Sequence, residues 1–157
     1  MPPAFVAVLD NIRSLHNVGS IFRTADGADV TKLYLCGMTG VPPRPEIRKA
    51  ALGAEETVPW EYFPQTGIAL EQLRASGYHI VALENSPTSV DYGLASFQFP
   101  LALVLGHEFE GIAPDLLAQC DMAISLPMRG RKSSLNVAVA FGIAAYEIAR
   151  RMDSSSR

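Results

Sequence analysis

The sequence predicts an α/β domain built around a parallel β-sheet that helices cover on both faces. Short apolar runs alternate with segments in which apolar residues recur at helical spacing. The runs are apolar at nearly every position, as is typical of strands buried on both faces of a sheet. The length of 157 residues suits one domain with one core. We expect this domain to span residues 1–151, followed by a flexible tail at 152–157.

Six short apolar runs are expected to form the strands, since each is bounded by polar or turn-forming residues. These runs are 4–9, 32–36, 57–63, 79–83, 101–105 and 122–126. Helices are expected at 18–28, 46–54, 68–76, 114–119 and 135–151. The segment 37–45, rich in glycine and proline, must be a loop, and 87–99 is expected to be a connection with about one helical turn.

Polar residues mark the starts of the first and last predicted helices. Asn17 precedes the first helix, and Ser133 or Ser134 precedes the last; each side chain can accept a hydrogen bond from a free backbone amide. Asn136 is a polar amide at the entrance of the apolar last helix, and a ligand could be the partner that a buried amide needs. Arg23 falls near the middle of the first helix, where an arginine beside apolar neighbours usually extends to the surface.

Polar segments follow four of the predicted strands, and ligands of parallel α/β sheets bind beyond the carboxyl ends of the strands. These segments are 10–17, 84–85, 106–111 and 127–134. Glycines in 106–111 allow the backbone to approach a ligand closely. Three cations surround Gly130 in the last segment. We therefore expect a ligand site at this edge of the sheet.

Several common kinds of site lack their signature in this sequence. There is no GxGxxG after the first strand, no GxxxxGK[ST] and no GxSxG, which argues against a standard dinucleotide site, a P-loop and a nucleophile elbow. His107 opens a segment that begins like HExxH, but Gly111 stands where the second histidine is needed. With three histidines in the chain, we expect no metal site.

Cysteine usage and hydropathy bear on the compartment. Cys36 and Cys120 are isolated from each other and are expected to be reduced thiols in a cytoplasmic protein. No apolar run has the length of a membrane span, and no signal peptide is visible. We therefore expect no association with a membrane.

Charge is unevenly distributed along the chain, whose net charge is -3. Residues 11–50 carry a net +3 and residues 122–157 a net +4, whereas residues 51–121 carry a net -9. If the fold brings the two basic parts together, one face is basic and the opposite face acidic. Such a face suits a polyanionic partner, although many proteins without one share this asymmetry.

Three clusters of residues match motifs of one family in order and spacing. Asn17, Gly19, Arg23, Thr24 and Ala25 match N-x-G-x-x-x-R-T-A; Gly106, Glu108 and Gly111 match G-x-E-x-x-G; Pro127, Met128, Gly130, Ser134, Leu135 and Asn136 match P-M-x-G-x-x-x-S-L-N. With these motifs the chain resembles the SpoU/TrmH branch of the SPOUT RNA methyltransferases, from about residue 5 to residue 149. The departures are small: Ala138 stands where many relatives have serine, and two histidines occupy variable positions.

The resemblance implies a deep trefoil knot at the carboxyl end of the domain, with S-adenosylmethionine held there mainly by backbone groups. The cofactor contacts carried over by position are Leu83 or Glu84, Gly106, Leu126, Ser134 and Leu135. The implied reaction is methyl transfer to a ribose 2′-hydroxyl of RNA. Its catalytic residues are Arg23, in the central role, with Asn17, Glu108, Ser134 and Asn136 around it. Because a guanidinium keeps its proton, we expect Arg23 to stabilise the developing alkoxide and clamp the adjacent phosphate.

Partners are implied as well. RNA phosphates are expected to meet seven cations, which are Arg13, Arg44, Arg48, Lys49, Arg129, Arg131 and Lys132. Many relatives carry an extra RNA-binding domain that is not seen here. Without it, the sequence does not choose between tRNA and rRNA as the target. A homodimer is expected because the family is dimeric and because the last helix is apolar over more of its circumference than one sheet face can cover.

Two other functions stay open from the sequence. A relative that methylates a base would keep the cofactor site but lose the pattern of Arg23 and Asn136. A non-catalytic RNA-binding or assembly module would keep the fold, although the intact polar residues of all three motifs argue against it. Binding of S-adenosylmethionine distinguishes this module from an enzyme.

Overall fold

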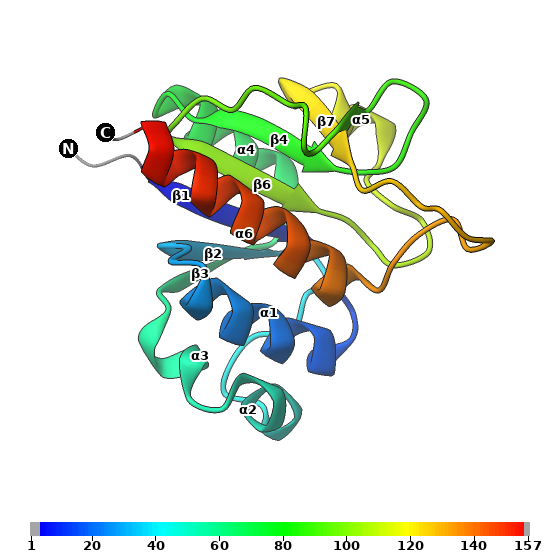
Figure 1. The fold of residues 1–157 in the computed structure, drawn as a ribbon. Helices are drawn as coiled ribbons and strands as arrows, with labels where there is room; N and C mark the ends of the chain where they lie inside the picture. Colours follow the sequence, from blue (N-terminus) through cyan, green and yellow to red (C-terminus); the bar gives the residue numbers. More distant parts are fainter. Residues whose placement is uncertain (1–3, 156–157) are drawn as a thin grey trace.

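Seven parallel strands form one sheet at the centre of the structure, a computed structural model that describes residues 4–155 (Figure 1). The strands are β1 (Phe5–Asp10), β2 (Lys32–Cys36), β3 (Trp60–Phe63), β4 (His79–Leu83), β5 (Val90–Asp91), β6 (Leu101–Leu105) and β7 (Met122–Ser125). Their order across the sheet is β3-β2-β1-β6-β4-β7-β5, and every adjacent pair is parallel. The predicted fold class is therefore confirmed.

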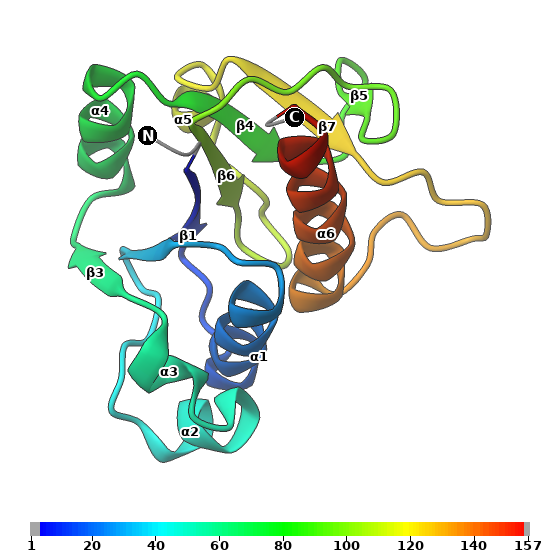
Figure 2. The ribbon, with the colours of Figure 1, turned by 60° about the vertical axis from the view of Figure 1, so that its left-hand side comes forward.

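Helices pack on both faces of this sheet (Figure 2). They are α1 (Leu15–Gly27), α2 (Pro45–Ala51), α3 (Ala54–Thr57), α4 (Thr66–Ala75), α5 (Pro114–Leu117) and α6 (Val137–Ser155). Successive side chains of a strand point to opposite faces, so Phe5, Ala7 and Leu9 of β1 pack with α1 and α6. Val6 and Val8 pack with α4 and α5 on the other face. Within residues 4–155, no helix has the length and apolar character needed to cross a membrane.

Helix α1 begins earlier than the sequence predicted. Its N-cap is Ser14, whose side chain accepts a hydrogen bond from the amide of Asn17 at 3.1 Å. Asn17, the predicted cap, lies instead inside the first turn and is buried. The prediction was wrong because both residues are good caps and the apolar pattern begins only at Val18.

Two further segments also differ from the prediction. The expected helix 46–54 is divided into α2 and α3, because Leu52 and Gly53 adopt left-handed backbone conformations with φ of 53° and 97°. The expected connection 87–99 contains β5, which pairs with β7 at the edge of the sheet. A strand of two residues is too short to produce a recognisable period.

Helix α6 extends further than predicted at its carboxyl end. Residues 152–155 are helical rather than a flexible tail, and 156–157 lie outside the described residues. Arg151 attaches this end to the segment that follows β5, because its two Nη atoms donate to the carbonyls of Ala95 and Gly93 at 2.8 and 2.7 Å. Its Nε donates to Glu147 at 2.6 Å on the preceding turn.

Both cysteines are free thiols, as predicted. Cys36 is buried and Cys120 is half-buried. Burial raises the pKa of the Cys36 thiol to about 12 and that of Cys120 to about 11. Thiols with these pKa values stay protonated at neutral pH and are poor nucleophiles.

The last residue of β1, Asp10, has a buried carboxyl group. Asp10 is 4% exposed and accepts a hydrogen bond of 2.5 Å from the hydroxyl of Thr66, the first residue of α4. Burial raises the pKa of Asp10, and this effect outweighs the lowering by the Thr66 hydroxyl. The folded protein therefore disfavours the charged form of this side chain.

We expect Asp10→Asn to raise the melting temperature at pH 7, because the amide keeps an acceptor for Thr66 and has no charge to bury. The native pKa of Asp10 lies above its unfolded value of 3.8, so the native state binds the proton more tightly. Below the unfolded pKa, Asp10 is neutral in both states, and its burial does not lower the free energy of unfolding. As pH rises through the native pKa, the charge on the buried carboxylate lowers the free energy of unfolding. Thermal denaturation should show a gap between variant and wild type at pH 7 that narrows near pH 4. An equal gap at both pH values would contradict this role.

Candidate active site at the carboxyl edge of the sheet

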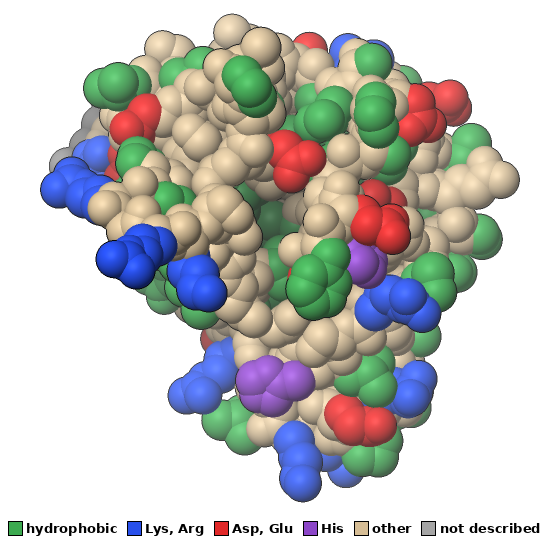
Figure 3. All heavy atoms as spheres, turned by 90° about the vertical axis from the view of Figure 1, so that its right-hand side faces the viewer, with side chains coloured by type: hydrophobic (Ala, Val, Ile, Leu, Met, Phe, Trp, Pro, Cys, Tyr) green, Lys and Arg blue, Asp and Glu red, His purple; other side chains and the backbone are tan. Residues whose placement is uncertain are grey.

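A cavity of about 330 Å³ opens at the carboxyl ends of β4, β6 and β7. Figure 3 faces the side of the molecule where the loops from this edge project, and it shows a hollow among them. The apolar residues in its wall are Leu83, Leu105, Phe109, Leu126, Met128, Leu135, Val137 and Ala140; the polar ones include Glu84, Asn85, His107, Glu108, Glu110, Ser133 and Ser134. A cavity of this size, lined by both apolar and polar groups, suits a small organic ligand.

Three of the four predicted ligand-binding segments line this cavity, namely 84–85, 106–111 and 127–134. They meet because β6, β4 and β7 are neighbours in the sheet. All of the residues predicted to contact a cofactor are in its wall, which are Leu83, Glu84, Gly106, Leu126, Ser134 and Leu135. The fourth segment, 10–17, ends beside the cavity, where Asn17 bonds to Glu108.

Both glycines of the second motif are required by close packing. A Cβ on Gly106 would lie 2.7 Å from the amide nitrogen of Ile112 and 2.7 Å from the carbonyl carbon of Gly111. Gly111 has a φ of 68°, and a Cβ there would lie 2.7 Å from Oε2 of Glu84. That oxygen accepts a hydrogen bond from the amide of Ile112 at 3.0 Å. The motif therefore joins the loop after β6 to the end of β4.

His107 organises the same loop through its ring. Nδ1 accepts hydrogen bonds from the amides of Phe109 and Glu110 at 3.1 Å each, so this nitrogen carries no proton. The amide of Gly111 donates to the carbonyl of His107 at 2.9 Å, which closes the loop. Sequence reasoning assigned no role to His107, because this capping depends on the folded shape of the loop.

Asn85 fastens the basic loop between β7 and α6 to the end of β4. Its Nδ2 donates to the carbonyls of Leu126 and Ser133 at 3.4 and 3.2 Å, and its Oδ1 accepts from the amide of Leu126 at 3.2 Å. These partners stand at the two ends of segment 127–132, so one side chain closes that loop. The sequence placed Asn85 in a ligand-binding segment but did not indicate this role; the available signal was an amide directly after a buried strand.

Side chains from all three motifs form one hydrogen-bonded chain beside the cavity. Asn136 Nδ2 donates to Oδ1 of Asn17 at 3.2 Å, and Asn17 Nδ2 donates to Oε1 of Glu108 at 3.3 Å. Glu108 lines the cavity. The sequence placed these residues in one site, and the structure brings these three together.

Asn136 is also the N-cap of α6. Its Oδ1 accepts hydrogen bonds from the amides of Ala138 and Val139 at 2.9 and 3.2 Å. The prediction that Ser133 or Ser134 caps this helix was therefore wrong, because the helix begins two residues later than the apolar pattern indicated. The hydrogen-bond partners of the Asn136 side chain are therefore the side chain of Asn17 and two backbone amides of α6.

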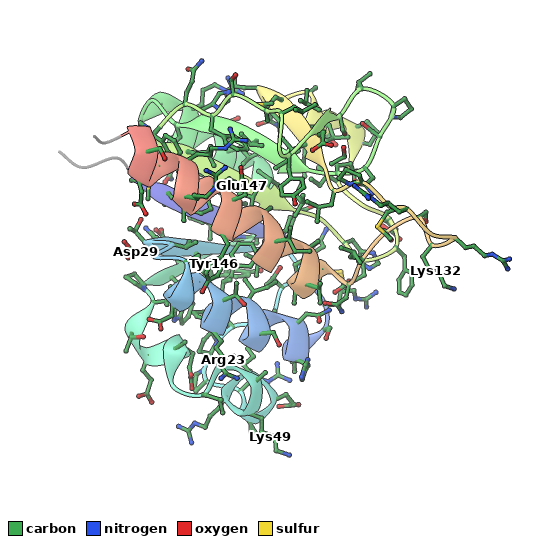
Figure 4. The ribbon with its side chains drawn as sticks, in the orientation of Figure 1. Arg23, Asp29, Lys49, Lys132, Tyr146 and Glu147 are labelled. Atoms are coloured by element: carbon green, nitrogen blue, oxygen red, sulfur yellow. The ribbon has the colours of Figure 1, made fainter. Side chains whose placement is uncertain are left out.

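Arg23 lies apart from these residues. It is exposed on α1 and does not line the cavity, and Figure 4 places it on the side of α1 that faces α2. Ser134, in contrast, lines the cavity together with Glu108. Within one chain, the structure thus gathers four of the five predicted catalytic residues and leaves Arg23 outside.

A groove runs between α1 and α6 next to the hydrogen-bonded chain. Its lining includes Asn17 and Asn136 and the exposed apolar side chains Val139, Ile143 and Tyr146 of α6. Figure 4 shows Tyr146 on the side of α6 that faces α1. As the sequence predicted, one sheet face does not cover the whole apolar surface of α6.

The seven cations predicted to contact RNA are all exposed, namely Arg13, Arg44, Arg48, Lys49, Arg129, Arg131 and Lys132. Figure 3 shows Lys and Arg side chains at several edges of the hollowed face. Figure 4 places Lys132 at the outer end of the loop between β7 and α6 and Lys49 on α2. Arg48 is 3.9 Å from Glu55, an ion pair that leaves most of its side chain exposed.

The fold and the cavity define an α/β protein whose ligand site lies at the carboxyl edge of a parallel sheet and is built from three sequence motifs. Comparison with known proteins gives its family. The family model of the SpoU rRNA Methylase family matches residues 4–146. The chain belongs to this family. The predicted resemblance to the SpoU/TrmH branch is thereby confirmed, while the trefoil knot stays a prediction.

Relatives match along nearly the whole chain. The 23S rRNA (guanosine-2′-O-)-methyltransferase RlmB of Pseudomonas putida is 32% identical over 149 residues, which cover 95% of this chain and 60% of that protein. The crystal structure of the SpoU methyltransferase AviRb from Streptomyces viridochromogenes, in complex with the cofactor AdoMet (S-adenosylmethionine), has a TM-score of 0.88 at 29% identity. It covers 98% of this chain and 63% of AviRb.

A second solved structure matches in length as well as in fold. It was solved to explain the 2-OH methylation of C/U34 on tRNA, and it has a TM-score of 0.84 at 28% identity, covering 99% of both chains. The chain nevertheless spans only about three fifths of the length of the curated relatives it matches.

Proposed function

We propose that this protein is an S-adenosylmethionine-dependent methyltransferase that acts on a ribose 2′-hydroxyl of tRNA or rRNA. The hydrogen-bonded chain from Asn136 through Asn17 to Glu108 is the observation that carries this proposal. It joins polar residues of all three motifs at the wall of a ligand cavity, where packing alone would favour apolar side chains. We further propose a cytoplasmic location, which two free cysteines favour.

The cavity fits the cofactor in size and in chemistry. Its apolar wall suits an adenine ring, and the backbone of the glycine-containing loop after β6 supplies close polar contacts. The carboxylates of Glu84, Glu108 and Glu110 suit a ligand that carries positive charge. When bound, the cofactor supplies an activated methyl group on its sulfonium. Ser134 and Leu135 would hold it from the side of α6.

Glu108 is placed to orient the acceptor hydroxyl. One of its oxygens accepts from Asn17, which is held in turn by Asn136, so two amides fix the carboxylate. A carboxylate in this position accepts a hydrogen bond from the 2′-hydroxyl and can take up its proton. Ser134 contacts the hydroxyl from the opposite loop. Asn136, which caps α6 and binds Asn17, is a positioning residue.

Within one chain Arg23 lies outside the cavity, and a second copy of the chain can bring it to such a hydroxyl. We place it in a homodimer in which the Arg23 of one chain serves the cavity of the other. The groove between α1 and α6, with its exposed Val139, Ile143 and Tyr146, supplies an apolar surface beside Asn17. The five donors of a guanidinium suit a phosphate or a developing alkoxide.

We expect a dimer mass in light scattering at micromolar concentration, twice the chain mass of 17.0 kDa. Ile143→Glu places a charge in the apolar groove and should yield monomers that still bind the cofactor but do not transfer methyl groups. Leu94→Glu, at another exposed apolar residue, is the matched control and should stay dimeric. A monomeric wild type would contradict the shared site.

Asn85→Asp should weaken S-adenosylmethionine binding by about tenfold or more. The carboxylate has no N–H to donate, and it would face the carbonyls of Leu126 and Ser133. The loop that carries Ser134 would then lose its attachment to β4. Calorimetry measures the affinity, with Thr88→Ala, an exposed position nearby in the same connection, as the control. Wild-type affinity in Asn85→Asp would show that the hydrogen bonds between Asn85 and this loop do not affect cofactor binding.

Exposed cations around the hollowed face would bind the RNA. Arg129, Arg131 and Lys132 stand on the loop that also lines the cavity, and Arg44, Arg48 and Lys49 lie on and before α2. Side chains of this kind contact phosphates and contribute affinity without sequence choice. Arg13, between β1 and α1, is exposed as well.

Transfer of a labelled methyl group from S-adenosylmethionine to RNA tests the proposed function. The purified protein is incubated with total RNA from cells that lack the gene, and the digested RNA is analysed for 2′-O-methylnucleosides. Label in these nucleosides, lost in Glu108→Ala, is the expected result. Label on a base would establish a base-modifying enzyme, and cofactor-free RNA binding without transfer would establish the non-catalytic module.

A further inference from the structure

Phe109 is the most exposed large hydrophobic side chain among residues 4–155, with 95% of its surface accessible. It stands in the loop after β6 and belongs to the wall of the cavity. The other strongly exposed apolar side chains, Leu94 and Leu52, lie outside that cavity. An aromatic ring that gains nothing from the core and sits at the mouth of a ligand site is suited to contact a partner.

Hydrogen bonds hold the backbone that carries this ring. The amides of Phe109 and Glu110 both donate to Nδ1 of His107, and the rings of His107 and Phe109 lie 6.0 Å apart between centroids. His107 and Gly111 are bridged across the base of the loop. Because the backbone is already ordered, a partner that contacts the ring orders little further chain on binding.

The charges around Phe109 favour an uncharged partner surface. Glu108 and Glu110 flank it in the sequence, so a phosphate would meet two carboxylates here. The cations that suit phosphates stand on the neighbouring loop, at Arg129 and Arg131. The face of a nucleobase carries no net charge and stacks on aromatic rings. An RNA strand can therefore place its phosphates on the basic loop and a base on Phe109.

We propose that Phe109 is a stacking platform for an unpaired base of the RNA substrate, at or next to the nucleotide whose ribose is methylated. This inference rests on the proposed function, since the acceptor ribose must enter the mouth of the cavity. Any base offers a face for stacking, so Phe109 contributes affinity rather than sequence choice. It also implies that the target lies in a loop or another single-stranded segment, because a paired base is not free to stack on a side chain.

The test compares RNA affinity over a range of salt concentrations for four variants. Phe109→Ala should bind RNA from cells lacking the gene about tenfold to a hundredfold more weakly, with the same salt dependence as the wild type. Phe109→Tyr should retain the affinity. Arg129→Glu combined with Arg131→Glu should instead reduce the slope of affinity against salt. Leu94→Ala, an exposed apolar residue outside the cavity, should behave as the wild type.

Three outcomes would overturn the proposal. Unchanged RNA affinity in Phe109→Ala, with methyl transfer by the wild type intact, would refute stacking and leave the proposed function standing. An equal loss of S-adenosylmethionine affinity, or a fall in melting temperature, would show that the ring serves the cofactor or the loop instead. A wild-type protein that neither binds nor methylates RNA would refute both the stacking and the proposed function.

Discussion

Arg23→Ala is expected to lower the rate of methyl transfer by at least ~10²–10³-fold at saturating RNA, the usual cost of removing one electrostatic donor to a developing oxyanion. Cofactor affinity should stay at the wild-type value, because Arg23 does not line the cavity. Arg23→Lys keeps the charge but loses the planar fork, so it should recover only part of the rate. Arg74→Ala, an exposed arginine on α4, is the matched control and should retain full activity.

A mixed dimer shows which cavity Arg23 serves. One chain carries Arg23→Ala and the other carries Glu108→Ala, and two different affinity tags isolate the heterodimer. If Arg23 acts across the interface, one of the two cavities has an intact Arg23 and an intact Glu108, and about half of the wild-type activity returns. If Arg23 acts on its own chain, both cavities are defective and the mixed dimer stays inactive. Near-full turnover by Arg23→Ala alone would remove this residue from the mechanism.

Gly106→Ala is expected to abolish S-adenosylmethionine binding and to destabilise the protein. The added Cβ would lie 2.5 Å from Cγ1 of Ile112 and 2.7 Å from two backbone atoms, so the two ends of the loop after β6 must move apart. Overpacking of this kind costs about 1–3 kcal/mol, which corresponds to a fall of several degrees in melting temperature. Calorimetry and thermal denaturation measure the two effects separately.

Gly130→Ala is the matched control for this substitution. Gly130 belongs to the third motif, its φ is not positive, and a Cβ there would meet no atom within 4 Å. It should therefore keep wild-type stability and cofactor affinity. If Gly106→Ala, folded by circular dichroism, binds the cofactor as the wild type does, the loop after β6 does not form the cofactor site.

Much of the fold could be predicted because the buried strands are apolar at nearly every position. The runs 32–36, 79–83 and 101–105 are strands with the predicted bounds. Prediction failed where local signals compete or are too short. Ser14 and Asn17 both suit an N-cap, and β5 has two residues. The knot could come only from the resemblance, since periodicity says nothing about how a chain is threaded.

The site was predictable to the extent that its residues belong to motifs. Glu108 and Asn136 were expected in one site, and the structure connects them through Asn17. The roles of Asn85 and His107 were missed because their partners are mainly backbone groups, and which backbone groups lie within reach depends on the folded loops. The position of Arg23 outside the cavity is likewise not contained in a motif, which records order along the chain and not arrangement in space.

Mass-spectrometric mapping of ribose methylation in tRNA and rRNA, from cells with and without the gene, tests the proposed function most directly. We predict that at least one 2′-O-methylated nucleotide disappears when the gene is removed and lies in a single-stranded segment. The wild-type gene should restore it, and a gene encoding Arg23→Ala should not. An identical set of ribose methylations in both RNA samples would contradict the assignment of this protein as a ribose methyltransferase.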